Sequence, residues 1–583
     1  MEYTLISERD DRSIIETLMS NRGITNFYHY INTTNADINS FNLFGIDKLR
    51  AAAQILFETI QKGESIALLV DSDLDGYFSS ALAANYLYKI FPNYTKNNVK
   101  FIYHELKVHG LKDTVEEIIK LKPGLVWSPD GSSGDIEEHL LLEKNNIKCI
   151  ITDHHEYDQE VETPAIIINS RSDTYPNKFL CGTGVTWQFC KYIDSLLGET
   201  YSEDLIDMVA VATIVDMMDL REYENKRLID IGLDNINNEF LKTIIKAQDY
   251  SIKKHGGLDP FSVGFYIGPM VNAITRVGTI EEKKIIFNSL LDINKELEVP
   301  STKRGCKGEL ELLVEQAVRT CTNVKNRQQR TRDSSLETVE NIISKFNLEN
   351  NKIIAVCLDK DHAINKALTG LVATQIANKY GHPTLILNDN DEEWSGSGRG
   401  VSNIGFDDFR GFVDNSGYSL LAQGHPPAFG AAFEKSKIQD FVTYANKELK
   451  NCNFSSSYKV DFIYDGNNFN GKEIIEIAEL KSLWGQEMPE PYIAIENLNI
   501  TKNNITLLSP DKNPTLKITL SNGAEIMKFK SSKEEFESFT SNENGCITIN
   551  LVAKCSINNW MGNIKPQLLI EDYEVIKKQQ YYF

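Results

Sequence analysis

The sequence has no long apolar run, no closely spaced cysteine pair and no excess of positive charge. No apolar stretch approaches the roughly 20 residues that a membrane-spanning helix requires, so we expect no membrane partner. The nine cysteines are odd in number and include no CxxC pair, which favours reduced thiols in the cytoplasm over a disulfide framework. The amino-terminal stretch MEYTLISERDDRS is polar and acidic, so we expect no signal peptide.

The missing positive charge limits how the chain can bind nucleic acid. Its 61 Lys and Arg against 82 Asp and Glu give a formal net charge of −21. Phosphate binding relies on Lys and Arg, so this balance argues against non-specific polyanion binding by the whole surface. Any contact with nucleic acid must therefore depend on local basic patches and on metal ions.

The sequence does contain two regions in which strands and helices alternate. At 583 residues the chain is too long for one core, and we expect about three or four domains. Between about residues 65 and 225, apolar strands separated by helices indicate a doubly wound parallel sheet; they read IALLV, GLVWS, IKCIIT and AIIIN. A second α/β unit begins with KIIAVCLD, and past about residue 450 short strands with Asn, Gly and Pro turns indicate a small closed β-barrel.

These patterns predict an α/β protein with five regions. They are an N-terminal helical segment (1–60), the parallel-sheet domain (61–230), a helical region ending in a long connecting helix (231–345), a second α/β domain (346–450) and the barrel (455–583). The connecting helix carries a cluster of cations, which form either a solvated face or a surface that follows nucleic acid. They are Arg319, Lys325, Arg327, Arg330 and Arg332.

Acidic and imidazole side chains follow four of the apolar segments. LLVDSDLDG carries Asp71, Asp73 and Asp75; VWSPDGSSG carries Asp130; CIITDHHEYD carries Asp153, His154 and His155; VAVATIVDMMD carries Asp216. Ligands of open α/β sheets bind at the carboxyl ends of the strands, so the first three segments deliver their polar groups to one rim. Oxygen and imidazole donors without cysteine favour a hard ion such as Mn²⁺, and five or more donors indicate two ions.

Each of these signals also has an ordinary structural explanation. A single Asp after a strand is most often the N-cap of the next helix, and two adjacent histidines occur by chance. Asp216 fits a structural role least well, because an unpaired carboxylate in so apolar a stretch is costly. Four such signals on the right elements together favour a metal site.

The motifs resemble those of a known family. DSDLDG, the Asp130 turn, TDHH and the Asp216 helix resemble the four motifs of the DHH phosphoesterase superfamily. WSGSGRG (394–400) and AQGHPPAFGAAF (422–433) resemble the signatures of its accessory DHHA1 domain. GPMVNAITRVG (268–278), NVKNRQQ (323–329) and the C-terminal strands resemble the RecJ single-strand DNA exonucleases and their oligonucleotide-binding (OB) barrel. The resemblance implies a DHH catalytic domain at 61–230, a DHHA1 domain at 346–450 and an OB-fold-like domain at 455–583.

The resemblance also implies roles for individual residues. Two ions, Mn²⁺ or Mg²⁺, would be held by Asp73, Asp75, Asp130, His154 and Asp216, with Asp130 as the bridge and Asp71 as a ligand directly or through water. His155 would contact the scissile phosphate, and Asp153 would orient an imidazole. Arg276 would be a further catalytic residue, in contact with the DNA backbone or the reacting phosphate. The implied substrate-binding residues are Asn272, Ser397, Arg399 and His425, with Trp560 either a stacking platform or a core residue.

Four positions depart from the family pattern. Met270 replaces an arginine of the PRLN segment, Thr275 replaces a glycine, and Phe429 adds bulk to the GGHxxAAG segment. His104 stands where the family has an arginine that helps to bind the 5′ phosphate. These changes leave the metal ligands in place and concern the binding of DNA and of its 5′ end.

The sequence therefore predicts a metal-dependent exonuclease that degrades single-stranded DNA from the 5′ end to mononucleotides in recombination, repair or replication. Its expected partners are single-stranded DNA and a single-strand binding protein or a helicase. One alternative is a DHH phosphodiesterase of short RNA or cyclic dinucleotides, against which the C-terminal barrel argues. Another is a DNA-binding replication scaffold with a decayed site, against which the complete ligand set argues.

Overall fold

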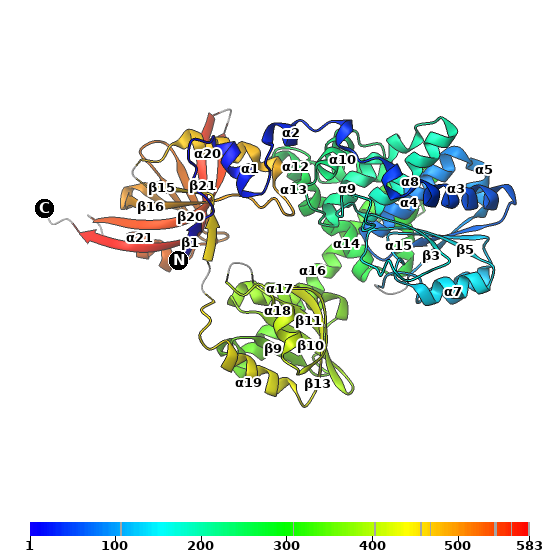
Figure 1. Ribbon diagram of the computed structural model, residues 1–583. Helices are drawn as coiled ribbons and strands as arrows, with labels where there is room; N and C mark the ends of the chain where they lie inside the picture. Colours follow the sequence, from blue (N-terminus) through cyan, green and yellow to red (C-terminus); the bar gives the residue numbers. More distant parts are fainter. Residues whose placement is uncertain are drawn as a thin grey trace. The chain divides into compact units, whose positions relative to one another are not determined.

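The computed structural model describes residues 1–104, 108–306, 308–401, 404–454, 457–466, 468–540, 545–560 and 563–580. The chain forms two compact units, shown in Figure 1. The first unit comprises residues 26–328 and 482–489, and the second comprises residues 1–25, 329–481 and 490–583. Across the described residues, no helix combines the length and the apolar character needed to cross a membrane.

The first unit is built on a five-stranded sheet in which every pairing is parallel. Its order is β3 (Val99–Tyr103), β2 (Ile66–Val70), β4 (Leu125–Pro129), β5 (Lys148–Asp153) and β6 (Ile166–Asn169). Strands β2 and β4 are buried along their whole length, as expected for a sheet covered on both faces. The predicted parallel α/β domain is confirmed, with β3 as an edge strand that the sequence did not reveal.

Helices cover both faces of this sheet. On one face, Val126, Ile151 and other alternate strand residues share a core with Ile118 of α6 and Leu142 of α7. On the other face, α4 packs against β2 and α8 against β5. The helices of this part are α2 (Phe27–Ile31), η1 (Asn35–Asp37), η2 (Phe41–Phe44), α3 (Ile46–Gln61), α4 (Leu74–Ile90), α5 (Pro92–Asn98), α6 (Val115–Leu121), α7 (Ile136–Lys144), α8 (Gly182–Leu197), η3 (Tyr201–Leu205) and α9 (Ile206–Val215).

A helical region completes the first unit. Its elements are α10 (Tyr223–Asp234), α11 (Glu239–Ala247), α12 (Asp249–His255), α13 (Pro260–Ser262), the π-helix η4 (Val263–Ile267), α14 (Gly268–Val277), α15 (Ile280–Leu290), η5 (Asp292–Asn294), β7 (Glu298–Pro300) and β8 (Leu310–Leu312). The predicted connecting helix is α16 (Leu313–Phe346), and the chain passes from the first unit to the second within it. The region predicted to be helical therefore also contains a hairpin, β7–β8, and α16 begins directly after it.

The second unit contains the second α/β domain. Its mixed sheet has the order β12 (Ser419–His425), β13 (Ala428–Glu434), β11 (Glu393–Arg399), β10 (Thr384–Asn390) and β9 (Ile354–Leu358). Two separate apolar cores, one including Phe409 and Phe441 and the other Val339 and Ile376, contain residues of this sheet. The remaining elements are η6 (Leu348–Asn350), η7 (Lys366–Leu368), α17 (Thr369–Tyr380), α18 (Phe409–Asn415) and α19 (Ile438–Glu448).

The C-terminal domain is a seven-stranded sheet. Its order is β15 (Phe462–Asp465), β16 (Tyr492–Thr501), β20 (Gly545–Trp560), β21 (Asn563–Gln580), β19 (Glu525–Phe529), β18 (Thr515–Thr519) and β17 (Ile505–Leu508). It is accompanied by β14 (Ser457–Val460), α20 (Gly471–Glu479), η8 (Leu480–Leu483), η9 (Lys502–Asn504) and α21 (Lys533–Thr540). Over the described residues the pairing ends at β15 on one side and at β17 on the other.

The first sixty residues divide between the two units. The chain begins with the strand β1 (Glu2–Leu5), which pairs in parallel with β14, and α1 (Ile14–Asn21) follows in the second unit. Residues 26–60 belong to the first unit. The segment expected to be helical therefore contains three α-helices, but it opens with a strand that completes the C-terminal domain.

Candidate active site

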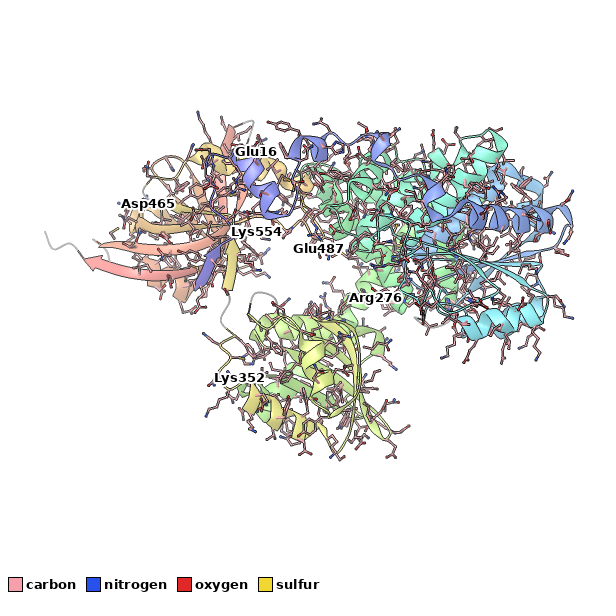
Figure 2. All side chains as sticks on the ribbon, viewed as in Figure 1. Glu16, Arg276, Lys352, Asp465, Glu487 and Lys554 are labelled. Atoms are coloured by element: carbon pink, nitrogen blue, oxygen red, sulfur yellow. The ribbon has the colours of Figure 1, made fainter. Side chains whose placement is uncertain are left out.

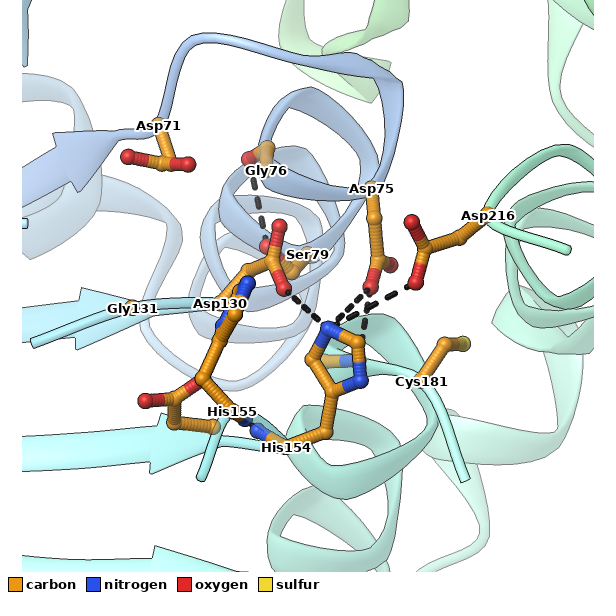
Figure 3. Close-up of polar contacts among 12 residues, drawn as sticks. Asp71, Asp75, Gly76, Ser79, Asp130, Gly131, His154, His155, Cys181 and Asp216 are labelled. Atoms are coloured by element: carbon orange, nitrogen blue, oxygen red, sulfur yellow. Dashed lines mark hydrogen bonds and ion pairs between the residues drawn. The ribbon is translucent and has the colours of Figure 1, made fainter. Parts of the chain in front are cut away.

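Four segments of the first unit bring their acidic and imidazole groups to one place (Figure 3). Asp71 follows β2, Asp130 follows β4, His154 follows β5, and Asp216 ends α9. His154 lies at the centre: its Nε2 is 3.2 Å from Asp130 Oδ1, 3.5 Å from Asp216 Oδ2 and 3.7 Å from Asp75 Oδ2. The structure thus places next to one another the residues that the sequence singled out as metal ligands.

Backbone geometry explains how Asp130 reaches this position. Asp130 adopts a left-handed conformation with φ of 62°, so the chain turns sharply as it leaves β4. The first turn of α8 approaches it closely: a Cβ on Gly182 would lie 2.4 Å from Asp130 Oδ1. A glycine at position 182 is therefore required for the start of α8 to lie against this carboxylate.

The start of α8 also holds Asp75. The Gly182 and Thr183 amides donate to its two carboxylate oxygens at 2.7 and 2.9 Å, and Thr183 Oγ1 donates to Oδ1 at 2.5 Å. Amide groups and the positive end of the helix dipole stabilise a carboxylate at this position. Our sequence reading missed Gly182 and Thr183, and the available signal was the stretch CGTG, the N-cap and first turn of a long apolar helix.

Asp71 is buried and has its own set of hydrogen-bonding partners. His109 Nδ1 and the Gly110 amide contact its two oxygens, the amide at 3.2 Å, and His104 Nε2 lies 3.4 Å from Oδ1. Burial alone would raise the pKa of Asp71, but the hydrogen bonds from the two imidazoles outweigh it and lower the pKa. His109 is a further site residue that the sequence analysis did not select.

His104 lies deeper than its expected role requires. Its side chain is fully buried, and its Nδ1 is 2.9 Å from Asp113 Oδ1 while its Nε2 faces Asp71. We expected this residue at a 5′-phosphate pocket, and its position gives that expectation no support. The geometry instead makes His104 a support for Asp71.

The carboxylate cluster has the properties of a cation site. Asp130 Oδ1 and Asp216 Oδ2 are buried and accept no hydrogen bond from the described residues. Burial and then the neighbouring carboxylates raise the pKa of both groups well above its usual range. Burial lowers the pKa of His154, which favours the neutral imidazole. Carboxylate oxygens and a neutral imidazole converging in this way fit a divalent ion.

The donor groups fall into three sets, each with ligand atoms within 4.8 Å of one another. Two of the sets share His154, and the third, which shares no residue with them, lies beside β2. The sets are Asp75, His154 and Asp216; Asp130, His154 and His155; and Asp71, Asp73 and His109. Asp73 also caps α4, accepting a hydrogen bond from the Gly76 amide at 3.1 Å, so it has a structural role in addition to its predicted role as a ligand.

Asp153 and His155 form a supported pair at the edge of the cluster. Asp153 is buried and accepts from the His154 amide at 2.7 Å and from the Ser133 amide at 3.1 Å, and its Oδ1 lies 2.8 Å from His155 Nδ1. Burial alone would lower the pKa of His155, but the hydrogen bond and charge of Asp153 raise it to about 9. About half of the His155 side chain is exposed, so a charged imidazole faces the solvent beside the metal ligands.

Helix α14 carries the two polar residues expected to contact DNA. Asn272 and Arg276 are both partly exposed, and Figure 2 marks Arg276. Burial lowers the pKa of Arg276, while the charge of Asp73 acts in the opposite direction, so the guanidinium lies within electrostatic reach of the cluster. Met270 and Thr275 are buried, so these two departures from the family pattern lie in the core of the unit.

Ser397 and Arg399 come together in the second unit. Ser397 Oγ is 2.8 Å from Thr369 Oγ1 at the start of α17, and a Cβ on Gly370 would lie 2.4 Å from Arg399 Nη2. The absence of a side chain at Gly370 thus makes room for the guanidinium beside the first turn of α17. His425 is exposed at the end of β12.

The remaining residues singled out from the sequence pack in the core, form ion pairs or have side chains outside the described residues. Phe429 packs in the core, where a Cβ on Gly398 would lie 2.5 Å from its ring. Arg319 pairs with Glu311, Arg327 with Glu282 and Arg332 with Asp333, so much of the basic cluster of α16 is already neutralised. The side chain of Trp560, at the end of β20, lies outside the described residues.

Comparisons with known proteins agree with this architecture. The pattern of the DHH family, N-terminal domain, matches residues 65–213, and that of the RecJ OB domain matches residues 460–572. The crystal structure of RecJ in complex with Mn²⁺ from Thermus thermophilus superposes with a TM-score of 0.71 at 17% identity, covering 97% of this chain and 76% of that one.

Two relatives from Bacillus subtilis align along most of the chain. One is named "Putative SPbeta prophage-derived single-strand DNA-specific exonuclease YorK"; it is 32% identical over 589 aligned positions, which cover 100% of this chain and 99% of that protein. The other is the single-stranded-DNA-specific exonuclease RecJ, 25% identical over 94% of this chain and 66% of that protein. Full-length similarity of this kind, together with the shared domains, shows that the chain belongs to the RecJ-like family of single-strand DNA-specific exonucleases in the DHH superfamily.

Proposed function

We propose that this protein is a metal-dependent exonuclease that degrades single-stranded DNA from its 5′ end to mononucleotides. One observation carries the proposal: oxygens of Asp75, Asp130 and Asp216 converge on His154 Nε2, and two of these oxygens are buried without a hydrogen-bond donor among the described residues. Relatives of this chain are named for exonuclease action on single-stranded DNA, and RecJ has been crystallised with Mn²⁺ and with Mg²⁺.

The site residues have distinct roles in phosphodiester hydrolysis. Two divalent ions, Mn²⁺ or Mg²⁺, would be held by the predicted ligands and would supply an activated water and charge stabilisation at phosphorus. His155, fixed by Asp153 and protonated at neutral pH, can donate a hydrogen bond to an oxygen of the scissile phosphate. Arg276, within electrostatic reach of Asp73, can bind the adjacent backbone. Hydrolysis by this route needs no covalent intermediate on the protein.

The start of α17 is suited to binding the 5′ terminal phosphate. Thr369 and Ser397 hydroxyls, the Arg399 guanidinium and the amino end of a 12-residue helix meet there. A terminal phosphate carries more charge than an internal one, so hydroxyl donors and a guanidinium fork distinguish a strand end from a continuing strand. This choice of end sets the direction of digestion.

We favour single-stranded DNA over the alternative substrates because the chain carries an OB domain in its C-terminal part. A decayed scaffold is disfavoured because each predicted metal ligand is present and all lie in one cluster or beside it. The proposal includes the cytoplasmic location and a single-strand binding protein or helicase as partner. Pull-down by the purified chain from a cytoplasmic extract, with and without nuclease treatment, tests the protein partner.

The decisive assay uses one 30-mer labelled at its 5′ or its 3′ end. With Mn²⁺ or Mg²⁺ we expect the 5′ label to be released at once as mononucleotide, while the 3′ label shortens progressively; EDTA and Asp130→Asn should stop both. Duplex DNA, single-stranded RNA and a cyclic dinucleotide serve as competing substrates. Preferred cleavage of RNA or of the cyclic dinucleotide, or release that begins at the 3′ end, would refute the proposal.

A further inference from the structure

A row of stacked aromatic rings lies in the helical segment before α14. The His255 ring, at the end of α12, stacks on Phe261 with centroids 4.3 Å apart and planes inclined by 18°. The Phe261 ring stacks in turn on Phe265, with centroids 5.3 Å apart and planes inclined by 11°. We call these three nearly parallel rings the aromatic ladder.

The ladder runs from a covered ring to exposed ones. The His255 side chain is mostly covered, with Nε2 3.2 Å from Asp259 Oδ2, whereas Phe261 is 43% exposed and Phe265 is 59% exposed. On the π-helical turn η4, which carries Phe265, Val263 and Ile267 are fully buried. The turn therefore has an apolar inner face that completes the core and an outer face that presents aromatic rings, and π-helical turns are frequent at functional sites.

The turn that carries Phe265, η4, packs on the end of α9: a Cβ on Gly264 would lie 3.7 Å from Ile214 Cγ2, and one on Gly268 would lie 2.9 Å from Val215 Cγ2. The next residue of α9 is the predicted ligand Asp216. On the other side, the turn leads directly into α14, which carries Arg276. Figure 1 shows α12, α13 and α14 in the same unit as α9.

We propose that the aromatic ladder stacks the bases of the single strand whose phosphates the metal centre cuts, with Phe265 as the outermost ring. This inference rests on the proposed function. Every base has a π face, so a row of parallel rings can be extended by one more stacked ring whatever the sequence. Exposed aliphatic side chains, by contrast, would suffice for a hydrophobic protein contact and would need no parallel planes.

The negative net charge of the protein explains why base stacking would be a useful source of affinity for DNA. Most single-strand binders hold the backbone with many cations, and this chain has a net charge of −21. Near the ladder, Lys253 is already paired with Asp249 at 2.7 Å. Stacking supplies affinity that does not depend on phosphate contacts, and it holds the strand next to the cluster without adding positive charge.

Binding is measured in the Asp130→Asn background, in which the strand is not cut, with a fluorescein-labelled 20-mer of thymidylate and Mn²⁺. Phe265→Ala should raise the Kd about 5- to 100-fold, the range expected for the loss of one stacked base. Phe265→Trp should keep or improve affinity, and Phe265→Leu, which keeps apolar bulk without a ring, should behave like the alanine variant. Tyr28→Ala, which removes a 69% exposed ring elsewhere in the first unit, is the matched control and should not change Kd.

A single abasic position separates stacking from a structural effect. Moving one abasic site along the 20-mer should identify a position that weakens binding to the Phe265 form and makes no further difference to the Phe265→Ala form.

The outcomes distinguish this inference from the function on which it rests. If the unsubstituted protein digests single-stranded DNA and Phe265→Ala binds and digests it equally well, or if every abasic position weakens both forms alike, the ladder does not stack bases and the proposed function stands. If the unsubstituted protein neither binds nor digests single-stranded DNA, the proposed function fails and the ladder with it.

Discussion

Thr183 Oγ1 donates a hydrogen bond of 2.5 Å to Oδ1 of Asp75, and the amide of the same threonine donates to the same oxygen at 2.9 Å. One residue at the start of α8 thus fixes a predicted metal ligand at the start of α4. The other oxygen of Asp75 lies 3.7 Å from His154 Nε2. A carboxylate held in this way keeps one oxygen directed toward the centre of the cluster.

Removing this support should weaken the metal centre without unfolding the protein. Thr183→Ala deletes one hydrogen bond to a charged group but keeps the amide, so we expect Mn²⁺ affinity or kcat to fall about 10- to 100-fold. Thr183→Ser keeps the hydroxyl and should retain most of the activity. The measurement is the Mn²⁺ dependence of nuclease rate for the three proteins. Equal rates for the alanine variant and the parent at limiting Mn²⁺ would contradict this role.

Neutralising one carboxylate should have opposite effects on activity and on stability. Asp130 is buried and the Asp216 side chain is 27% exposed; burial and the neighbouring carboxylates raise the pKa of both groups, so their charged forms are disfavoured without an ion. We expect Asp216→Asn to abolish hydrolysis and to raise the thermal midpoint of the metal-free protein by a few degrees. Added Mn²⁺ should stabilise the parent protein and much less the variant. A lower midpoint in EDTA for Asp216→Asn would contradict the assignment of a repulsive cluster.

A pH dependence of stability is expected at Asp207, away from the cluster. Burial raises the pKa of this carboxyl to about 6, although the amides of Met208, Asn237 and Asn238 donate to it. The folded protein therefore binds this proton more tightly than the unfolded chain, so Asp207 costs stability increasingly as the pH rises through about 6. Relative to Asp207→Asn, the parent should lose thermal stability between about pH 4 and pH 7, the range from the unfolded pKa to just above the folded one. A constant difference over that range would show that Asp207 is ionised throughout.

The preference for a 5′ phosphate should depend on Arg399. Its guanidinium lies beside Gly370 at the start of α17, so Arg399→Ala should remove the preference for 5′-phosphorylated over 5′-hydroxyl oligonucleotides and slow digestion. Lys447→Ala, at an 83% exposed position of α19, is the control and should leave the preference unchanged. Equal loss of rate on both kinds of end would argue against the pocket.

Salt should weaken DNA binding only modestly. Arg319, Arg327 and Arg332 of α16 are paired with carboxylates, and the net charge of the chain is −21, so we expect few cations to contact phosphates. The slope of log Kd against log salt should therefore correspond to a few phosphate contacts. A slope equivalent to about six or more contacts would reveal a cationic channel that these ion pairs do not suggest.

Strand positions and the gathering of acidic and imidazole groups at the strand ends could be predicted from the sequence because both follow from local patterns. Strand β2, an unbroken apolar run, ends where Asp71 begins, and β5 ends at Asp153, next to His154. Strand β3, VKFIY, escaped notice because it is an edge strand with an exposed lysine that interrupts its apolar run. The hairpin β7–β8 fell within a region predicted to be helical, because a stretch as short as LELL is compatible with both the helical and the strand pattern of apolar residues.

The residues that support the ligands could not be predicted in this way. Thr183 and Gly182 act because α8 starts against Asp75 and Asp130, and that contact exists only once the chain has folded. His104 was expected at a phosphate from its place in the family pattern, whereas burial beside Asp71 and Asp113 determines its actual contacts. The aromatic ladder likewise joins α12, α13 and η4, whose rings become parallel only through tertiary packing.

The most direct test of the metal centre is a Mn²⁺ titration of the metal-free protein, followed by calorimetry and by release of a 5′ label from single-stranded DNA in the same samples. We expect two ions per chain, no hydrolysis in EDTA, and a rate that rises as the second ion binds; Asp130→Asn should lose at least one ion and all measurable turnover. Full activity in EDTA, or normal Mn²⁺ binding and turnover by Asp130→Asn, would contradict the account.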